Sequence, residues 1–168
     1  SGDWFHQHFG VSKDPLRLTA WFGTNNSRAR KPGLPGEAIT DRGAIDMVVI
    51  SHFHADHVNG LLMPDNSRAF PNAEIKVPEV EWKFWMDDGE MSRAPAGRQA
   101  TFQTVRKVFE AGLNKKVTPY EWGKDVAPGL LAVETVGHTP GHTSFVLSSG
   151  ADKVFVQSDV TNLPALFV

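Results

Sequence analysis

The most informative stretch of this sequence is Ser-His-Phe-His-Ala-Asp-His at residues 51–57. It directly follows Ile45–Ile50 (IDMVVI), a mostly β-branched and apolar run that predicts a buried strand. Because alternate residues at the end of a strand point to the same side, we expect His52 and His54 to face one cavity. The pattern therefore indicates a polar site at the tip of a buried strand.

The second half of this motif adds Asp56 and His57, which lie on the turn beyond the strand and can face the same cavity. The motif then offers three imidazoles and a carboxylate, a donor set that suits a borderline divalent ion such as zinc. Packing these ionisable groups together without a metal would cost desolvation and mutual repulsion, so a purely structural role is the weaker interpretation. A stretch this short cannot surround a tetrahedral ion comfortably, so further ligands must come from elsewhere in the chain.

A second polar cluster, Gly-His-Thr-Pro-Gly-His at residues 137–142, follows a strand predicted over Leu130–Val136. Its glycines permit a tight turn, and Pro140 stiffens it. Asp159 comes just after a third apolar strand, predicted over Lys153–Gln157. Ligands that converge from three strand ends are what a rigid metal cavity requires, and the sequence predicts such a cavity here.

The histidines outside the first motif are not equivalent. We predict His138 as a metal ligand, together with Asp159. For His142 we favour a hydrogen bond to the loop or to substrate, with a ligand role as the lesser alternative. His6 and His8 are most simply surface residues near the end of the chain.

Strand and helix patterns alternate along the rest of the chain, which predicts an α/β or α+β class. The helix expected over Gly97–Leu113 carries its apolar residues at helical spacing on one face. The other expected elements are a helical turn over Val58–Met63, a strand over Ala73–Val77, a helix over Pro78–Asp87, and a strand over Thr143–Ser148 that forms a hairpin with the strand at 153–157.

Length and composition bound the function classes. With 168 residues the chain predicts one globular domain, 44–168, preceded by an atypical loop-rich segment, 1–43. A net charge of −2 with scattered basic residues argues against nucleic acid as a partner. The absence of cysteine excludes thiolate ligands and a Cys nucleophile. There is no bilayer-length apolar run and no signal-peptide pattern, so no membrane partner is expected, and the compartment is open between bacterial cytoplasm and periplasm.

These motifs closely resemble the metallo-β-lactamase superfamily, whose hallmark is His-x-His-x-Asp-His after a strand, a later Gly-His loop and a single Asp after another strand. Within it the chain looks most similar to the methyl parathion hydrolase group and its lactonase-like relatives. The further similarities are AFPNA at 69–73, EWKFW at 81–85 and GHTPGHTSFVL at 137–147. The resemblance covers about Ala44 to Val168.

The resemblance implies an αββα sandwich with a two-metal site, most simply zinc, with Mn, Co or Fe as other divalent candidates. It assigns ligands to both metals: His52, His54 and His138 to one, Asp56 and His57 to the other, and Asp159 as a bridge between them. A metal-activated water would then attack an ester, lactone or organophosphate-type small molecule. Catalytic roles would fall to Asp56 and Asp159, with His142 steadying its loop.

Two alternatives stay open at this point. Trp82, Phe84 and Trp85 could line an apolar substrate pocket, although their helical spacing favours a core role. The family also carries a last histidine ligand beyond the bridging Asp, whereas this chain ends at Val168. One alternative is therefore a weakly active or non-catalytic metal-binding fragment that needs a partner chain, with a second copy of itself as one candidate. Another is that His6 or His8 replaces the missing ligand.

Overall fold

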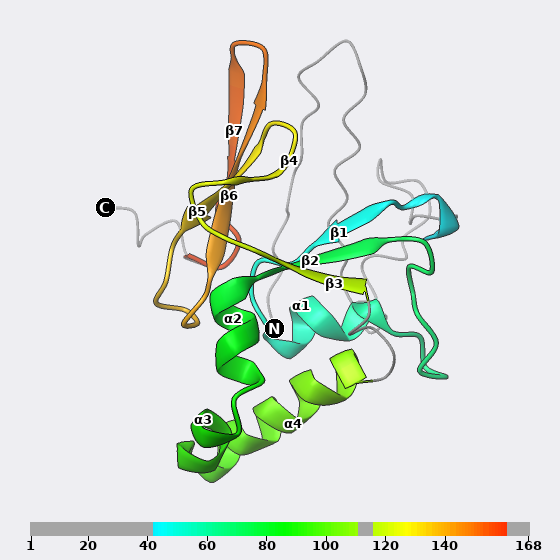
Figure 1. The fold of residues 1–168 in the computed structure, drawn as a ribbon, viewed down its shortest axis with the longest axis vertical. Helices are drawn as coiled ribbons and strands as arrows, with labels where there is room; N and C mark the ends of the chain where they lie inside the picture. Colours follow the sequence, from blue (N-terminus) through cyan, green and yellow to red (C-terminus); the bar gives the residue numbers. More distant parts are fainter. Residues whose placement is uncertain (1–41, 111–115, 161–168) are drawn as a thin grey trace, which may run out of the picture.

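The computed structural model describes residues 42–110 and 116–160, and these residues form two sheets and one helical layer. A parallel sheet has the strand order β1-β2-β3, and an antiparallel sheet has the order β4-β5-β6-β7. Figure 1 shows the helices on one side of the parallel sheet and the antiparallel sheet on the other. The strands are β1 (Met47–Val49), β2 (Glu74–Pro78), β3 (Val117–Tyr120), β4 (Asp125–Ala127), β5 (Leu130–Glu134), β6 (Thr143–Ser149) and β7 (Asp152–Val156). The helices are α1 (Ala55–Val58), α2 (Glu79–Trp85), α3 (Asp88–Arg93) and α4 (Ala96–Glu110), with 3₁₀ turns η1 (Arg42–Ala44) and η2 (Asn59–Leu61).

The larger core lies between the helices and the parallel sheet. Helix α4 buries Phe102, Val105, Val108 and Phe109, the face that the sequence pattern predicted. The Phe53 ring packs against that of Phe109 with 4.8 Å between centroids. Burying each such side chain contributes about 1.5–3 kcal/mol, so this layer holds the parallel sheet firmly.

A smaller core joins the parallel sheet to the antiparallel one through four buried residues: Tyr120, Val126, Ala132 and Phe145. Two polar contacts reinforce it near the start of residues 51–57. The Tyr120 hydroxyl donates to the Ile50 carbonyl at 2.7 Å, and the Thr143 amide donates to the Ser51 carbonyl at 3.1 Å. The first residues of β6 are therefore tied to the loop that follows β1.

The predicted α/β class is confirmed, and most predicted elements are present with shifted ends. The predicted strand Ile45–Ile50 shortens to β1, which is only partly buried because it is an edge strand of the described parallel sheet. The hairpin is confirmed, with Ser149 paired to Asp152 and Gly150 at φ +59° in its turn. The predictions for residues 1–41, 111–115 and 161–168, among them His6, His8 and Leu113, lie outside the described residues.

Two strands, one α-helix and the short 3₁₀ turn η1 were not predicted, and one prediction was wrong in its position. Strand β3 contains Pro119, which is tolerated because β3 is an edge strand of the described sheet. Helix α3 begins at an N-cap, where the Asp87 carboxylate accepts the Glu90 amide at 2.8 Å. Strand β4 has only three residues, too few for an alternating pattern. The helical turn expected from Val58 begins already at Ala55, so Asp56 and His57 are helical.

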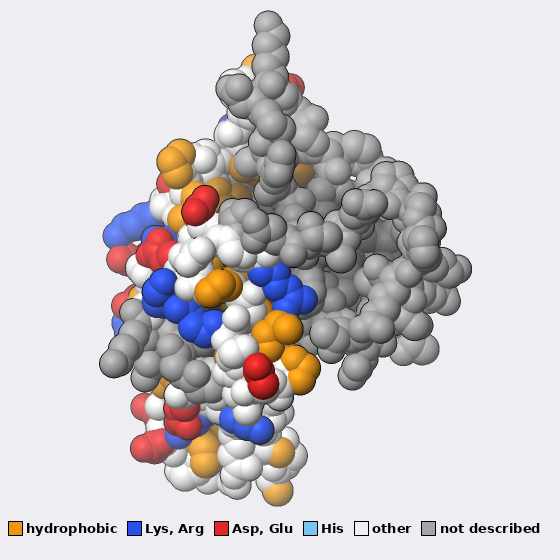
Figure 2. Space-filling view, turned by 90° about the vertical axis from the view of Figure 1, so that its right-hand side faces the viewer, with side chains coloured by type: hydrophobic (Ala, Val, Ile, Leu, Met, Phe, Trp, Pro, Cys, Tyr) orange, Lys and Arg blue, Asp and Glu red, His pale blue; other side chains and the backbone are white. Residues whose placement is uncertain are grey.

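Surface charge and helix character bear on the expectations for nucleic-acid and membrane partners. Figure 2 shows Lys and Arg side chains interspersed with Asp and Glu on the described part of one face. None of the helices in the described ranges has the length and apolar character needed to cross a membrane.

Candidate metal centre

The structure brings the predicted ligands of three separate loops together. His52 and His54 follow β1 and lie on one side, with ring centroids 4.9 Å apart, while Phe53 between them points into the larger core. His138 comes from the loop between β5 and β6, and its Nε2 lies 2.9 Å from His54 Nδ1. Asp159 follows β7, and its Oδ2 lies 3.2 Å from His57 Nε2. Strand alternation and loop convergence thus produce the cavity that the motifs indicated.

Two overlapping groups of side chains are close enough to hold a metal ion. The first contains His52, His54 and His138, and the second contains His52, His57 and Asp159. Within each group the possible ligand atoms all lie within 4.8 Å of one another. The groups share His52, which places it at the centre of the site.

His52 has the properties of a metal ligand. Its side chain is fully buried, and its Nε2 has no hydrogen-bond partner among the described residues. Burial, followed by the charge of His57, lowers the pKa of His52 to about 2, so the ring is neutral at ordinary pH. An unpaired, buried imidazole nitrogen is costly unless something binds it, and a divalent cation is the partner that neutral imidazole prefers.

The other ring nitrogen of His52, Nδ1, forms a hydrogen bond on the side away from the ligand groups. This nitrogen lies 3.1 Å from the Ser51 hydroxyl, which in turn accepts a hydrogen bond from the Ser158 hydroxyl at 2.8 Å. Ser158 has φ 53°, in the left-handed region, directly before Asp159. The same short chain of hydrogen bonds therefore orients one ligand and anchors the residue next to another.

Asp159 is available as an ionised ligand. The hydrogen bond from His57 holds the pKa of the Asp159 carboxyl below its ordinary value, although partial burial opposes this. Its side chain is 33% exposed, and Oδ2 lies 3.6 Å from His138 Nε2 and 3.8 Å from His52 Nε2. This one oxygen faces ligands of both groups, which is the position a bridging carboxylate needs.

His142 is fully buried, and both of its ring nitrogens are engaged. Nδ1 donates to the Thr135 carbonyl at 3.0 Å, and Nε2 accepts the Asp159 amide at 3.1 Å. Burial lowers the pKa of His142, which keeps the ring neutral and able to accept that amide. The ring therefore contacts its own loop and the backbone of Asp159, and its catalytic role stays a prediction.

Asp56 is the predicted ligand that the structure does not bring into either group. Its side chain is 80% exposed, and its Oδ2 lies 3.7 Å from His57 Nε2. As the second residue of α1 it points along the outside of the first helical turn. A ligand role for Asp56 stays a prediction.

Glu81 is a buried acid of the site that the motif analysis did not single out. It is fully buried on α2 and accepts hydrogen bonds from Phe53 N at 2.9 Å, Trp85 Nε1 at 2.6 Å and Gly141 N at 2.6 Å. The available signal was an acidic residue four positions before a buried Trp, on the apolar face of a predicted helix.

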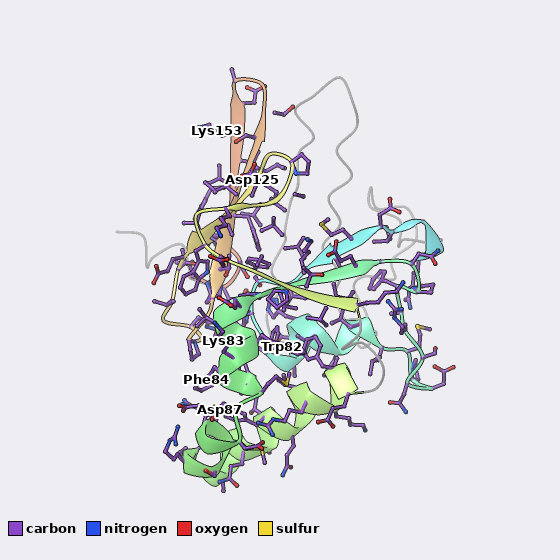
Figure 3. All side chains as sticks on the ribbon, in the orientation of Figure 1. Trp82, Lys83, Phe84, Asp87, Asp125 and Lys153 are labelled. Atoms are coloured by element: carbon purple, nitrogen blue, oxygen red, sulfur yellow. The ribbon has the colours of Figure 1, made fainter. Side chains whose placement is uncertain are left out.

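A hollow of about 290 Å³ lies beside the ligands. Phe84, Trp85 and Arg98 line it, together with His54, His138 and other residues of the 137–140 loop. Trp85 borders the hollow but is 3% exposed and belongs to the larger core, so the core role favoured by the helical spacing is confirmed for Trp85. Trp82 packs edge-on against Phe53 and Phe109 beside that core. In Figure 3, Trp82 and Phe84 lie on opposite sides of α2.

Comparison with known proteins agrees with this geometry. A family model described as the metallo-beta-lactamase superfamily matches residues 23–161, and so begins upstream of the boundary predicted at residue 44. An N-acyl homoserine lactonase from Bacillus sp is 26% identical over 102 residues, which make up 61% of this chain and 32% of the relative.

Two solved structures are similar. One is the hydrolase AbOPH of the beta lactamase superfamily, with a TM-score of 0.64, 30% identity, and coverage of 72% of this chain and 43% of that one. The other is AidC, a dizinc quorum-quenching lactonase in complex with its product, with a TM-score of 0.60, 25% identity, and coverage of 68% and 41%. The chain thus spans less than half the length of each of these relatives.

The match over most of the chain, the two sheets with their helical layer, and the strand-end histidines all agree with the resemblance seen in the motifs. The chain belongs to the metallo-beta-lactamase superfamily.

Proposed function

We propose that this chain is a metal-dependent hydrolase of a small ester-type substrate, with a lactone as the first candidate. The observation that carries the proposal is the buried Nε2 of His52, which has no hydrogen-bond partner among the described residues and is shared by two groups of possible ligands. A lactonase and a dizinc lactonase among the similar proteins support the choice of substrate and of zinc.

The residues of the site divide into metal ligands and residues that orient those ligands. His52, His54 and His138 would hold one ion, and His57 and Asp159, with Asp56 as a further candidate, would hold the second. Divalent ions bound in this way supply Lewis acidity and lower the pKa of water towards neutrality. Ser51 and His142 orient His52 and the Asp159 backbone from behind, so little reorganisation is needed when the site binds a cation.

The hollow beside the ligands suits a small substrate. Its volume of about 290 Å³ lies near the lower end of ligand-binding pockets, which favours a compact ester or lactone over a polymer. Phe84, which is only partly buried, offers apolar contact to an acyl or aryl group. The Arg98 side chain is exposed at the rim and can donate to a carbonyl or phosphoryl oxygen.

Elemental analysis combined with three hydrolysis assays tests the proposal. We expect the purified chain to carry zinc and to hydrolyse a lactone, an aryl ester or a phosphotriester, and a chelator should abolish the activity reversibly. His138→Asn should lose metal and activity together, whereas Glu79→Gln, at a side chain in neither ligand group, should lose neither. A chain that binds no divalent ion at micromolar concentrations, or whose activity survives chelation, would contradict the proposal.

One observation favours a second candidate, a metal-binding unit with little or no activity of its own. Among the described residues, the second ligand group borrows His52 from the first, and Asp56 is 80% exposed. In that case the chain would bind one ion per molecule and turn over none of the three substrates. Metal stoichiometry measured beside activity separates the two candidates.

A further inference from the structure

The buried carboxylate of Glu81 lies between the two loops that supply His54 and His138. Its Oε2 accepts the amide of Phe53, the residue between His52 and His54, at 2.9 Å. Its Oε1 accepts the amide of Gly141, which lies between His138 and His142, at 2.6 Å. One side chain therefore holds the backbone of both ligand loops, although the loops are far apart in the sequence.

Burying this carboxylate costs desolvation free energy. It is fully buried, and among the described residues no Lys or Arg forms an ion pair with it. In the described part of the chain its charge is met by three N–H donors alone: the two loop amides and the Trp85 indole. A buried charge that is met only by fixed donors favours one geometry, because any displacement of either loop leaves the charge poorly solvated.

The absence of a side chain at Gly141 permits its close contact with Glu81. A Cβ at this position would collide with the Glu81 backbone nitrogen and would lie 2.8 Å from Glu81 Cγ. The loop backbone therefore packs directly on the first turn of α2, and only glycine lets its amide reach the carboxylate. Contact geometry and hydrogen bonding point to the same pair of residues.

We propose that Glu81 is a positioning residue that sets the separation between the two ligand loops, so that His54 and His138 bind the same ion. This inference rests on the proposed metal site, because the function of the Glu81 contacts is to shape that site. Glu81 belongs to neither group of possible ligands, and it acts through the amides of Phe53 and Gly141.

The central test is Glu81→Gln in the metal-bound chain. The amide has nearly the same shape, but it has one oxygen for donors on both sides, so it must turn an N–H group towards at least one loop amide. We expect the affinity for Zn²⁺, measured by competition with a chelator, to fall by roughly 10- to 100-fold, as for other residues that orient metal ligands. With Co²⁺ as the probe, the visible absorption spectrum should change, because it reports ligand geometry. Glu81→Asp retains the charge and should recover part of the affinity.

Two controls separate positioning from general stability. Glu79→Gln makes the same substitution on the same helix, at a side chain that is 40% exposed and paired with Lys83. Val108→Ala destabilises the larger core at a residue that belongs to neither group of possible ligands. Both should retain wild-type Zn²⁺ affinity and the wild-type Co²⁺ spectrum. If Val108→Ala alters them as Glu81→Gln does, the effect is one of stability and the proposal is wrong.

A readout without metal keeps this inference distinct from the proposed function. In the metal-free wild type, the Phe53 and Gly141 amide protons should resonate downfield and exchange slowly, and in Glu81→Gln at least one should lose both properties. Gly141→Ala should produce the same loss from the other side of the contact. If wild type binds no metal, the proposed function fails. If wild type binds metal and Glu81→Gln matches it in affinity, spectrum and amide exchange, the positioning role of Glu81 is wrong.

Discussion

The two sheets contribute to the metal centre from very different surroundings. The parallel sheet is backed by helices and a large core, and it supplies His52, which is fully buried. The antiparallel sheet shares only a small core, and Phe155 on β7 is 56% exposed. Its loops supply His138 and Asp159, whose side chains are 35% and 33% exposed. One half of the site is therefore built on a rigid frame, and the other half is held against it by a few contacts and by the ligands themselves.

The largest effect should come from the residue at the centre of both halves. His52→Asn removes the nitrogen shared by both ligand groups, so we expect metal content and hydrolytic activity to fall to background. His57→Asn removes a ligand from the second group only and should retain the ion held by the first. Elemental analysis of both variants checks this, and wild-type metal content in His52→Asn would remove His52 from the centre of the site.

Substitutions in the larger core should lower the free energy of unfolding more than substitutions on the antiparallel sheet. Phe102→Ala leaves a cavity in the larger core and should lower the free energy of unfolding by about 3–5 kcal/mol. Phe155→Ala changes an exposed side chain and should stay within about 0.5 kcal/mol of wild type. Denaturant titration of the two variants measures both values, and equal losses would mean that β7 is buried by something that the described residues do not include.

Metal removal should loosen the two halves unequally. At a free metal concentration of 100 times Kd, binding stabilises the folded chain by about 2.7 kcal/mol. On chelation, we expect amide protection to fall most in β6 and β7, which lead into or out of ligand loops, and least in α4, whose buried face lies in the larger core. Hydrogen exchange with and without chelator tests this, and uniform loss of protection along the chain would argue that the two halves unfold as one.

A small effect, confined to stability, should come from the N-terminus of α3. Asp87→Ala removes the carboxylate that caps the Glu90 amide, and should cost about 1 kcal/mol of stability without changing metal affinity. Thermal unfolding and chelator competition measure the two quantities separately. A loss of affinity in this variant would show that the helical layer transmits strain to the site.

Local patterns account for what could be predicted. The buried face of α4 follows from helical spacing, and the placing of His52 and His54 on one side follows from strand alternation. Strand β3 escaped prediction because its conformation depends on hydrogen bonds to β2, which override the poor strand propensity of Pro119. Helix α3 was not predicted because its Asp87 cap coincides with the end of the helix predicted over Pro78–Asp87, and α3 itself has only six residues.

The donor set, the order of the ligand motifs and the helical and strand periods can be read from the sequence alone, because each of these is local information. Which donors meet depends on the tertiary structure. The contact between His57 and Asp159 spans 102 residues, and the contact between Glu81 and Gly141 spans 60. Such pairings depend on how two sheets and a helix pack, and this is also why Asp56 stays exposed while Glu81, an acid of the same charge, is buried between the ligand loops.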